Sequence, residues 1–389
     1  MNKFDFETIA DSIDYGFGTD FSMEHTMMAG AQLHVKTAPS VIRALKGLSE
    51  AGLFGWTPSD EKKYIDATVN WMKTVREWNV RKDWIVPSYG ILQAMCTSIR
   101  AFTDPGDGII IQPPVYLLYA RAIDRCGRNL VNNPLVYKGD HWEMDFVDLE
   151  EKMSRPENKL MLLCNPHNPT MDVWEKKELE RVARLAAKYH VLVVVDEIYA
   201  EHVWEEGLMV PYGALSDAEH NCIVCTSLGK SFNFTGTSHA NIIIPDDAIR
   251  GAYITQRNSD HYGSLSPFMR AALLGGYTKE GKAWIDALME FSGENEKIVR
   301  DFFAENFPKV HFCRHRAGTL LWADFREMGT EEEVYAMGVE KKEIIVNYAV
   351  GDTVRILDGP LSSFTGTVES VDVDNNAVNV VVSMFGRET

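Results

Sequence analysis

The sequence has no apolar run long enough to cross a membrane, since no stretch approaches the roughly 20 apolar residues that such a helix needs. The N-terminal stretch, MNKFDFETIADSIDYG, also lacks the cationic start and apolar core of a secretory signal peptide. Basic residues are outnumbered, because 39 Lys and Arg stand against 56 Asp and Glu, for a formal net charge of −17. Such an acidic chain has no overall attraction to nucleic-acid phosphates or to an anionic membrane. These features predict a cytoplasmic protein that contacts neither a membrane nor nucleic acid directly.

The six cysteines are scattered through the 389 residues, which is typical of a protein kept in a reducing compartment. Cys222 and Cys225 form a CxxC pattern, but they lie in an apolar, strand-like run. Residues three apart on a strand face opposite sides of the sheet. Because no second Cys or His pair is placed to match, we expect no metal site.

Five short apolar runs between residues 80 and 230 alternate with helix-like segments. They lie in DWIVPSYG, GDGIIIQPPVY, KLMLLCNPHNP, VLVVVDEIY and CIVCTSLGK. The runs are continuous rather than alternating, which is typical of a parallel sheet covered by helices on both faces. Helical spacing of apolar residues predicts helices over 60–80 and 175–190, and a turn at 87–90 precedes a further helix. The sequence therefore predicts an α/β fold with a mainly parallel central sheet.

The last segment, 347–389, has a different character. Apolar and polar residues alternate in it, as at Val378, Val380 and Val382. Turn-forming sequences stand at 358–360 and 374–376. This pattern predicts a small antiparallel β-barrel.

Polar residues follow the predicted strands, and parallel α/β sheets bind ligands at the carboxyl ends of their strands. A pyridoxal-phosphate site needs a lysine for a Schiff base and a carboxylate for the pyridine nitrogen. It also needs a polar partner for the ring hydroxyl, an aromatic cover, and N–H groups for the phosphate. The candidates are Lys230 for the Schiff base, Asp196 for the pyridine nitrogen, Asn168 and Tyr199 for the ring hydroxyl, Tyr116 for stacking, and Tyr89, Gly90, Ile91 and Ser227 for the phosphate.

Each of these residues has a simpler interpretation when it is taken singly. A lysine after a strand is most often a solvated loop residue, and an aspartate there is most often a turn or cap residue. Tyr116 alone is typical of a core aromatic. The set as a whole favours the cofactor site, because separate strand ends carry the required residue types.

Residues 40–328 resemble the fold-type I pyridoxal-phosphate enzymes of the aminotransferase class I/II superfamily, and within it the MalY/PatB group of cystathionine β-lyase-like proteins. The resemblance rests on GLFGWT, IRAFTDPGDGIIIQPPVY, LLCNPHNPT, VLVVVDEIYAEHVW and CTSLGKSFNFTG. It implies the roles given above for Lys230, Asp196, Asn168, Tyr199, Tyr116, Ser227, Gly90 and Ile91. It also implies a homodimer with active sites at the subunit interface.

The sequence departs from the family pattern at four places. Met171 stands where family members commonly have glycine. Trp56 replaces a tyrosine that contacts the phosphate of the neighbouring subunit, and an indole offers only its N–H. TMMAGAQLH (26–34) replaces a segment that borders the substrate. No arginine matches the one that normally clamps the substrate carboxylate as a bidentate pair.

From about Gly329 the chain resembles a different family, the NusG-type bacterial transcription factors. EEEVYAMGVEKKEIIVNYAV and the residues after it are similar to the linker and KOW domain of those proteins. The resemblance implies contacts with transcription or ribosomal proteins through exposed residues such as Leu361 and Phe364. Packing of both residues inside a small barrel is the alternative.

These patterns together predict five segments. They are an N-terminal part of a small domain (1–50), a large pyridoxal-phosphate-binding domain (51–280), an incomplete C-terminal part of the small domain (281–328), a linker (329–346) and a KOW-like β-barrel (347–389). A natural fusion and an artefactual join both account for this order.

The expected activity is that of a pyridoxal-phosphate-dependent carbon–sulfur β-lyase. Such an enzyme converts cystathionine or another cysteine S-conjugate to pyruvate, ammonia and a thiol. Lys230 removes the Cα proton in this scheme, and the incomplete small domain lowers stability and turnover. The alternatives are a pyridoxal-phosphate-dependent aminotransferase and a non-catalytic regulatory or transcription-linked binding protein.

Overall fold

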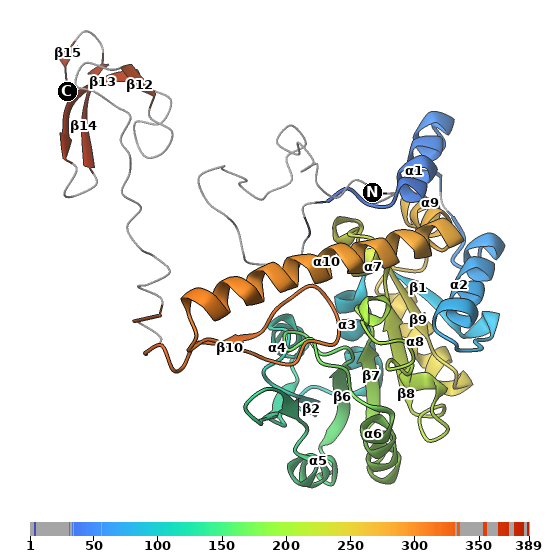
Figure 1. Ribbon diagram of the computed structural model, residues 1–389. Coiled ribbons are helices and arrows are strands. Elements are labelled where there is room, and N and C mark those ends of the chain that lie inside the picture. Colours follow the sequence, from blue (N-terminus) through green and yellow to red (C-terminus); the bar gives the residue numbers. More distant parts are fainter. Residues whose placement is uncertain are drawn as a thin grey trace. The chain divides into compact units, whose positions relative to one another are not determined.

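The computed structural model of the chain describes residues 4, 31, 33, 35–55, 57–330, 333–334, 353–355, 365–372, 377–384 and 387–388. The chain divides into two compact units, Met1–Asp324 and Phe325–Thr389, and the first carries the large sheet (Figure 1). No helix among the described residues is both long enough and apolar enough to cross a membrane.

A seven-stranded sheet forms the centre of the first unit, with the strand order β1-β9-β8-β7-β6-β2-β3. The strands are β1 (Ile85–Ser88), β2 (Gly108–Ile111), β3 (Asn129–Asn132), β6 (Asn158–Cys164), β7 (Leu192–Asp196), β8 (Cys222–Thr226) and β9 (Ala240–Ile243). β9 runs antiparallel to both of its neighbours, and the other pairs are parallel. The prediction of a mainly parallel central sheet is therefore confirmed.

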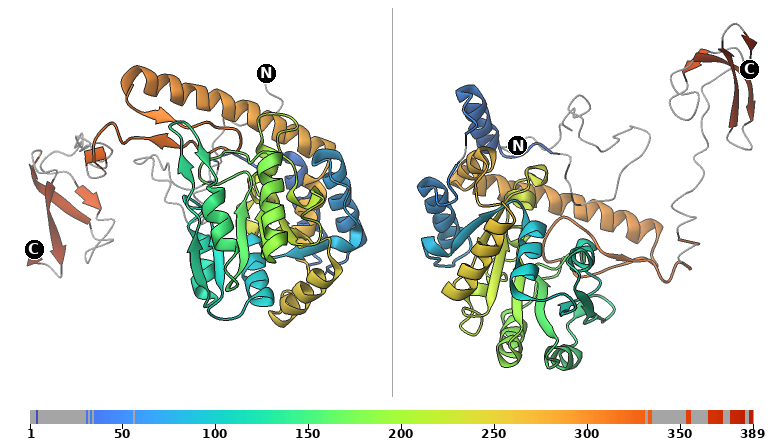
Figure 2. Two further views of the ribbon diagram at one scale, coloured as in Figure 1. Left: turned by 90° about the horizontal axis from the view of Figure 1, so that it is seen from below. Right: turned by 180° about the vertical axis from the view of Figure 1, so that it is seen from behind.

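Helices cover both faces of this sheet (Figure 2). One face packs against α3 (Ile91–Phe102), α4 (Leu118–Arg125) and α8 (Asp247–Ser259). The other packs against α5 (Phe146–Met153) and α6 (Lys176–Tyr189). Successive residues of each strand point into different cores, which explains the continuous apolar runs. Cys222 lies in one core and Cys225 in the other, as predicted, and the described residues contain no group of His, Cys, Asp or Glu suited to a metal ion.

Four further long helices and several short elements complete the first unit. The helices are α1 (Pro39–Ala51), α2 (Lys62–Val75), α9 (Pro267–Gly276) and α10 (Lys279–Asn306). The short elements include α7 (Leu228–Ser231), four short 3-10 helices among the described residues, and the two-stranded sheets β4 (Val136–Tyr137) with β5 (Trp142–Glu143) and β10 (His311–Phe312) with β11 (Ala323–Asp324). α1 and α9 approach closely at Gly275, where an added Cβ would lie 2.6 Å from Ser40 O. The second half of α10 exposes Ile298 and Phe302 at 66% and 52%.

Two predicted boundaries are wrong. The helix expected over 60–80 ends at Val75, and Glu77 then takes the left-handed conformation with φ +52°. The turn expected at 87–90 begins later, because Pro87 and Ser88 belong to β1. A proline is tolerated there because β1 lies at the edge of the sheet, where a missing N–H leaves no neighbouring strand unsatisfied.

The second unit contains a four-stranded antiparallel sheet of β12 (Thr353–Arg355), β13 (Thr365–Asp372), β14 (Ala377–Met384) and β15 (Arg387–Glu388). β13 and β14 pair on either side of the turn predicted at 374–376. The turn predicted at 358–360, Leu361 and Phe364 lie outside the described residues. Closure into a β-barrel stays a prediction.

Candidate functional site

Four strands of the large sheet end at the same edge, and the predicted site residues follow them. Cys164 at the end of β6 lies opposite Asp196 of β7, which lies opposite Cys225 of β8. Ser88, the last residue of β1, pairs with Ala240 at the start of antiparallel β9. The carboxyl ends of β1, β6, β7 and β8 therefore meet, and this edge is where parallel α/β sheets bind ligands.

Asp196 ends β7 with its side chain almost fully buried, at 6% exposure. Tyr119 OH donates to its Oδ2 at 2.8 Å, and the backbone N–H of Ile198 donates to Oδ1 at 3.0 Å. Burial raises the pKa of Asp196 to about 6, against the opposing effects of these two hydrogen bonds and of the Lys230 charge. Within the described part of the chain this carboxylate has no ion-pair partner, so it can accept a hydrogen bond from a cationic ring N–H.

Tyr119 is a site residue that the sequence analysis missed. Its side chain is fully buried, and its ring meets that of Tyr116 edge-on at a centroid distance of 6.0 Å. Tyr116 is 39% exposed, and both burial and the Asp196 charge raise its pKa. The spacing of three residues in VYLLY was the available signal, because residues three apart lie on one side of a helical turn.

Lys230 lies in the short helix α7, just after β8. Its Nζ donates to the backbone oxygen of Ala31 at 2.7 Å. Burial lowers the pKa of Lys230, and the charge of Asp196 opposes that effect. A lowered pKa increases the neutral fraction of the amine, which is the nucleophilic and basic form. The structure thus brings Lys230 within electrostatic reach of Asp196, as the predicted roles of the two residues require.

Tyr199 and Asn168 also reach this edge of the sheet. Tyr199 is 1% exposed, and its hydroxyl has no hydrogen-bond partner among the described residues. Burial raises its pKa, with further contributions from Cys164, Asp196 and Tyr116, so the phenol stays neutral and can donate. An unpaired buried hydroxyl costs about 1–3 kcal/mol, which a ligand acceptor would remove. Asn168 is half-buried, and its backbone N–H donates to Cys164 Sγ at 3.4 Å.

The first turn of α3 has no side-chain cap among the described residues. Gly90 precedes Ile91, the first residue of the helix, with φ +104° and no side-chain cap. A Cβ added at Gly90 would meet nothing closer than 3.9 Å. Uncapped N–H groups at a helix N-terminus suit an anion such as a phosphate. The predicted phosphate role of Gly90 and Ile91 is consistent with this geometry.

Ser227 and Trp56 are two further residues predicted to bind the cofactor. The Ser227 hydroxyl donates to His239 O at 2.5 Å and accepts from the N–H of Gly229 at 2.9 Å, as the N-cap of α7. A hydroxyl has a single proton, so in this arrangement Ser227 has none to donate to a phosphate. Its phosphate role stays a prediction. Trp56 lies outside the described residues.

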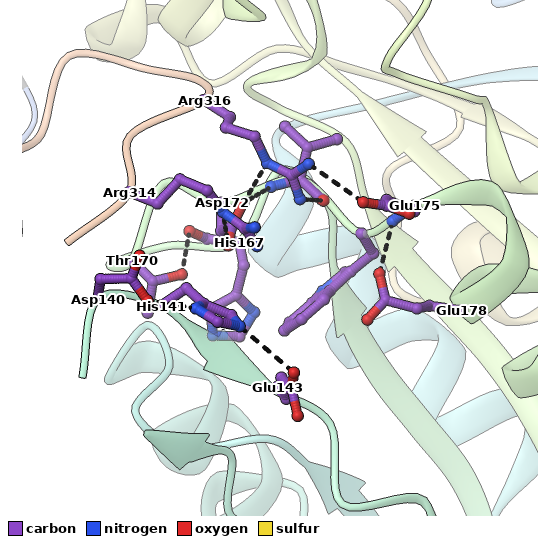
Figure 3. Close-up of polar contacts among 12 residues, drawn as sticks. Asp140, His141, Glu143, His167, Thr170, Asp172, Glu175, Glu178, Arg314 and Arg316 are labelled. Atoms are coloured by element: carbon purple, nitrogen blue, oxygen red, sulfur yellow. Dashed lines mark hydrogen bonds and ion pairs between the residues drawn. The ribbon is translucent and has the colours of Figure 1, made fainter. Parts of the chain in front are cut away.

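Ion pairs join the segment after β10 to the loop that follows β6 (Figure 3). Asp172 is buried, and its carboxylate binds Arg314 Nη2 at 2.6 Å and Arg316 Nε at 2.5 Å. The backbone N–H groups of Arg316 and Ala317 both donate to Met171 O at 3.0 Å. Both arginines are thereby engaged with Asp172, so in this arrangement neither is available to a substrate carboxylate.

Met171 is fully buried beside the site although it has φ +53°. A Cβ added at Gly318 would lie 2.3 Å from Met171 Sδ and 3.5 Å from the ring of Tyr199. Gly318 itself has φ +73° and donates its N–H to His202 O at 2.8 Å. The methionine that replaces the usual glycine is thus accommodated because residue 318 has no side chain.

Known proteins resemble this chain in sequence. The sequence matches the family model for aminotransferase class I and II over residues 27–356 and the KOW motif over residues 350–383. Cystathionine beta-lyase PatB of Bacillus subtilis (strain 168) is 32% identical over 318 residues, which span 81% of this chain and 82% of that protein. Protein MalY of Escherichia coli (strain K12) is 28% identical over 343 residues, spanning 87% and 86% of the two chains.

A solved structure shares the fold. It is cystalysin from Treponema denticola, whose crystal contains a pyridoxal 5'-phosphate cofactor. It aligns with a TM-score of 0.81 at 27% identity, covering 86% of this chain and 87% of that one. Together with the family match over more than half of the residues, this likeness gives the conclusion. The chain belongs to the aminotransferase class I and II family and has its fold-type I α/β architecture.

Proposed function

We propose that this protein is a pyridoxal-phosphate-dependent carbon–sulfur β-lyase acting on a small amino-acid substrate. The observation that carries the proposal is the buried Asp196 carboxylate, which has two neutral hydrogen-bond donors and lies within electrostatic reach of Lys230. The printed name of PatB supports the reaction type, and the cofactor of cystalysin supports the cofactor class.

The residues at the sheet edge fit this cofactor by their chemistry. Asp196 would hold the pyridine nitrogen, and the unpaired hydroxyl of Tyr199, with Asn168, would meet the ring hydroxyl. Tyr116 would cover the ring. The open N-terminus of α3 at Gly90 would receive the phosphate. Among the described residues, the buried Tyr199 hydroxyl has no hydrogen-bond partner and the buried Asp196 carboxylate has no ion-pair partner, and such a ligand would supply both.

Pyridoxal phosphate supplies an electrophilic aldehyde and a ring that accepts electrons from the substrate Cα. The chain supplies the proton transfers. Lys230, whose pKa burial lowers, can take the Cα proton at Nζ in its neutral form. Loss of that proton allows the Cβ–S bond to break, so that a thiolate leaves. Hydrolysis of the remaining three-carbon fragment gives pyruvate and ammonia.

The visible spectrum of the purified protein with pyridoxal phosphate tests the cofactor assignment. We expect the absorption band of the lysine-bound cofactor in the wild-type chain and its loss in Lys230→Ala. Lys188→Ala is the matched control, because Lys188 is an exposed lysine paired with Glu150 on the surface. A wild-type chain without the band, or a Lys230→Ala variant that keeps it, would contradict the assignment.

The reaction type is tested separately. The alternative is an aminotransferase, which shares proton removal and differs in the fate of the carbanion. Release of pyruvate and thiol from cystathionine without added keto acid supports the lyase. Turnover that requires a keto acid supports the aminotransferase, as does the family description.

The remaining proposals concern organisation. We propose the domain boundaries 1–50, 51–280, 281–328, 329–346 and 347–389, together with a homodimer. We also propose impaired turnover, because no arginine matches the usual carboxylate clamp.

The six free cysteines support a reducing compartment such as the cytoplasm. The KOW match supports a protein contact of the tail with transcription or ribosomal proteins, which is the non-catalytic alternative. Co-purification of such proteins with the full chain, lost on deleting 341–389, is the corresponding test.

A further inference from the structure

A buried ionic network adjoins the candidate site through residues next to Asp196 and Lys230, and it has no part in the chemistry proposed above. Its centre is Arg76, the C-cap residue of α2, whose side chain is 3% exposed. The guanidinium forms ion pairs with Glu197 through Nη2 and with Glu201 through Nη1, the second at 3.3 Å. Both carboxylates are as deeply buried as the arginine, at 0% and 3%.

Each carboxylate of this network is joined to one of the two proposed cofactor-binding segments. Glu197 directly follows Asp196 in the chain, and its Oε1 accepts from the N–H of Tyr212 at 2.8 Å. Glu201 Oε2 accepts from the hydroxyl of Ser231 at 2.8 Å, and Ser231 directly follows Lys230. One guanidinium therefore links Glu197, the neighbour of Asp196, to Glu201, which accepts the hydrogen bond of Ser231, the neighbour of Lys230.

The network is nearly complete in its hydrogen bonds. Glu201 Oε1 also accepts from Trp71 Nε1 at 3.1 Å, and the network leaves Arg76 Nε without a partner among the described residues. Burial lowers the pKa of Arg76, but the two carboxylates more than offset this and raise it. Burial raises the pKa of Glu197 against the charge of Arg76. Buried ion pairs contribute little net stability compared with apolar packing. Stability therefore does not explain why these ion pairs lie between two segments of the candidate site.

We infer that Arg76 is a positioning residue, which sets the distance between Lys230 and Asp196 through Ser231, Glu201 and Glu197. This inference rests on the proposed cofactor chemistry. A planar guanidinium holds two carboxylates at a fixed separation, which a lysine ammonium does not. Misplacement of a reacting group by about 1 Å can lower a rate about 100-fold. The network thereby fixes the geometry that the chemistry needs without touching the cofactor.

The experiment compares Arg76→Lys and Ser231→Ala with matched controls. Ser231→Ala keeps all three charges and removes a single tether, so it avoids the unfolding that an unpaired buried carboxylate risks. Its control is Ser98→Ala, a buried serine whose hydroxyl bonds Ala94 O at 2.9 Å within α3. The control for Arg76→Lys is Arg100→Lys, which alters the Arg100–Asp260 pair.

The first readout is hydrogen exchange followed by mass spectrometry in the cofactor-free protein. We expect both test variants to speed exchange at 228–233, and Arg76→Lys to speed it also at 197–202, with the rest of the chain unchanged. Exchange in these segments no faster than in the control variants would overturn the inference. This readout does not depend on the proposed function, whose failure would appear instead as a missing cofactor band in the wild-type protein.

The second readout is the steady-state kinetics and the visible spectrum of the protein with bound cofactor. We expect kcat to fall about 10- to 100-fold in Arg76→Lys, with KM changed less than about threefold, and an altered visible band of the lysine-bound cofactor. A purely structural role predicts lower stability with the wild-type band and kcat. That outcome would also overturn the inference.

Discussion

Substitution of Asp196 by asparagine should remove the pH dependence that this residue imposes on stability. In the folded, cofactor-free protein, burial raises the pKa of Asp196 from 3.8 to about 6. The folded state therefore holds the proton more tightly than the unfolded state does. Stability from this group is complete below about pH 4 and is lost as the pH rises through about 6.

The magnitude follows from the two pKa values. At about 1.4 kcal/mol per pKa unit, the difference between 3.8 and about 6 corresponds to about 3 kcal/mol of unfolding free energy lost between pH 4 and pH 7. Asparagine does not titrate, so Asp196→Asn should gain about 3 kcal/mol relative to wild type over that range. Asparagine also places an amide N–H₂ against a donor, either Tyr119 OH or Ile198 N–H. That mismatch adds an offset that does not vary with pH, so the slope is the quantity to test.

Urea unfolding of both cofactor-free proteins at half-unit steps from pH 4 to pH 7.5 measures the slope. Asp246→Asn is the control, because backbone hydrogen bonds from Ile249 and Ala248 at the start of α8 lower the pKa of Asp246. Its difference curve should be nearly flat over this range, since a carboxylate with a lowered pKa loses its stabilisation only as the pH falls below its unfolded value of 3.8. A difference between wild type and Asp196→Asn that stays constant within about 1 kcal/mol from pH 4 to pH 7 would refute the reasoning.

Three further substitutions test the neighbourhood of the site by urea unfolding at pH 7. Tyr119→Phe removes a hydrogen bond to the buried Asp196 carboxylate and should cost about 1.5–3 kcal/mol, and an effect below 0.5 kcal/mol would place the hydroxyl elsewhere. Gly318→Ala adds a Cβ 2.3 Å from Met171 Sδ at a residue with φ +73°. It should cost more than the about 1–2 kcal/mol of the left-handed conformation alone. Adding Met171→Ala should relieve only the part of the cost that comes from the clash with Met171. Ser227→Ala removes the N-cap of α7 and should cost about 1 kcal/mol, while a cofactor affinity that falls more than about tenfold would indicate a direct phosphate contact.

The sheet and most of the site could be predicted because their signals are local. A continuous apolar run such as that of β7 needs two covered faces, and the polar residue after it then lies at the ligand-binding edge. This reasoning points to Asp196 and Lys230 from the sequence alone. The antiparallel strands of the second unit likewise followed from alternation and turn residues, whereas the KOW assignment came from the resemblance to a known family.

The parts that could not be predicted depend on contacts between distant residues. No glycine or proline marks the end of α2 at Val75, where the chain turns and Arg76 pairs with Glu197 and Glu201. The acidic partners lie 121 and 125 residues further along the chain, and no spacing rule connects them. Ser227 illustrates the reverse case. Its type and place suggest a phosphate contact, but the hydroxyl is used by His239 and Gly229.

The carboxylate oxygens of the Arg76 network and the polar groups at the sheet edge differ in whether they have partners. In the Arg76 network every carboxylate oxygen has a donor. At the sheet edge, Tyr199 OH has none among the described residues, and Asp196 carries a charge without an ion-pair partner there. Groups left in this state destabilise the ligand-free fold. Binding to the native state alone raises the free energy of unfolding. A ligand that satisfies both groups should raise it further, because it also removes the cost of these two buried groups. This gain adds to that from its contacts with exposed residues such as Tyr116.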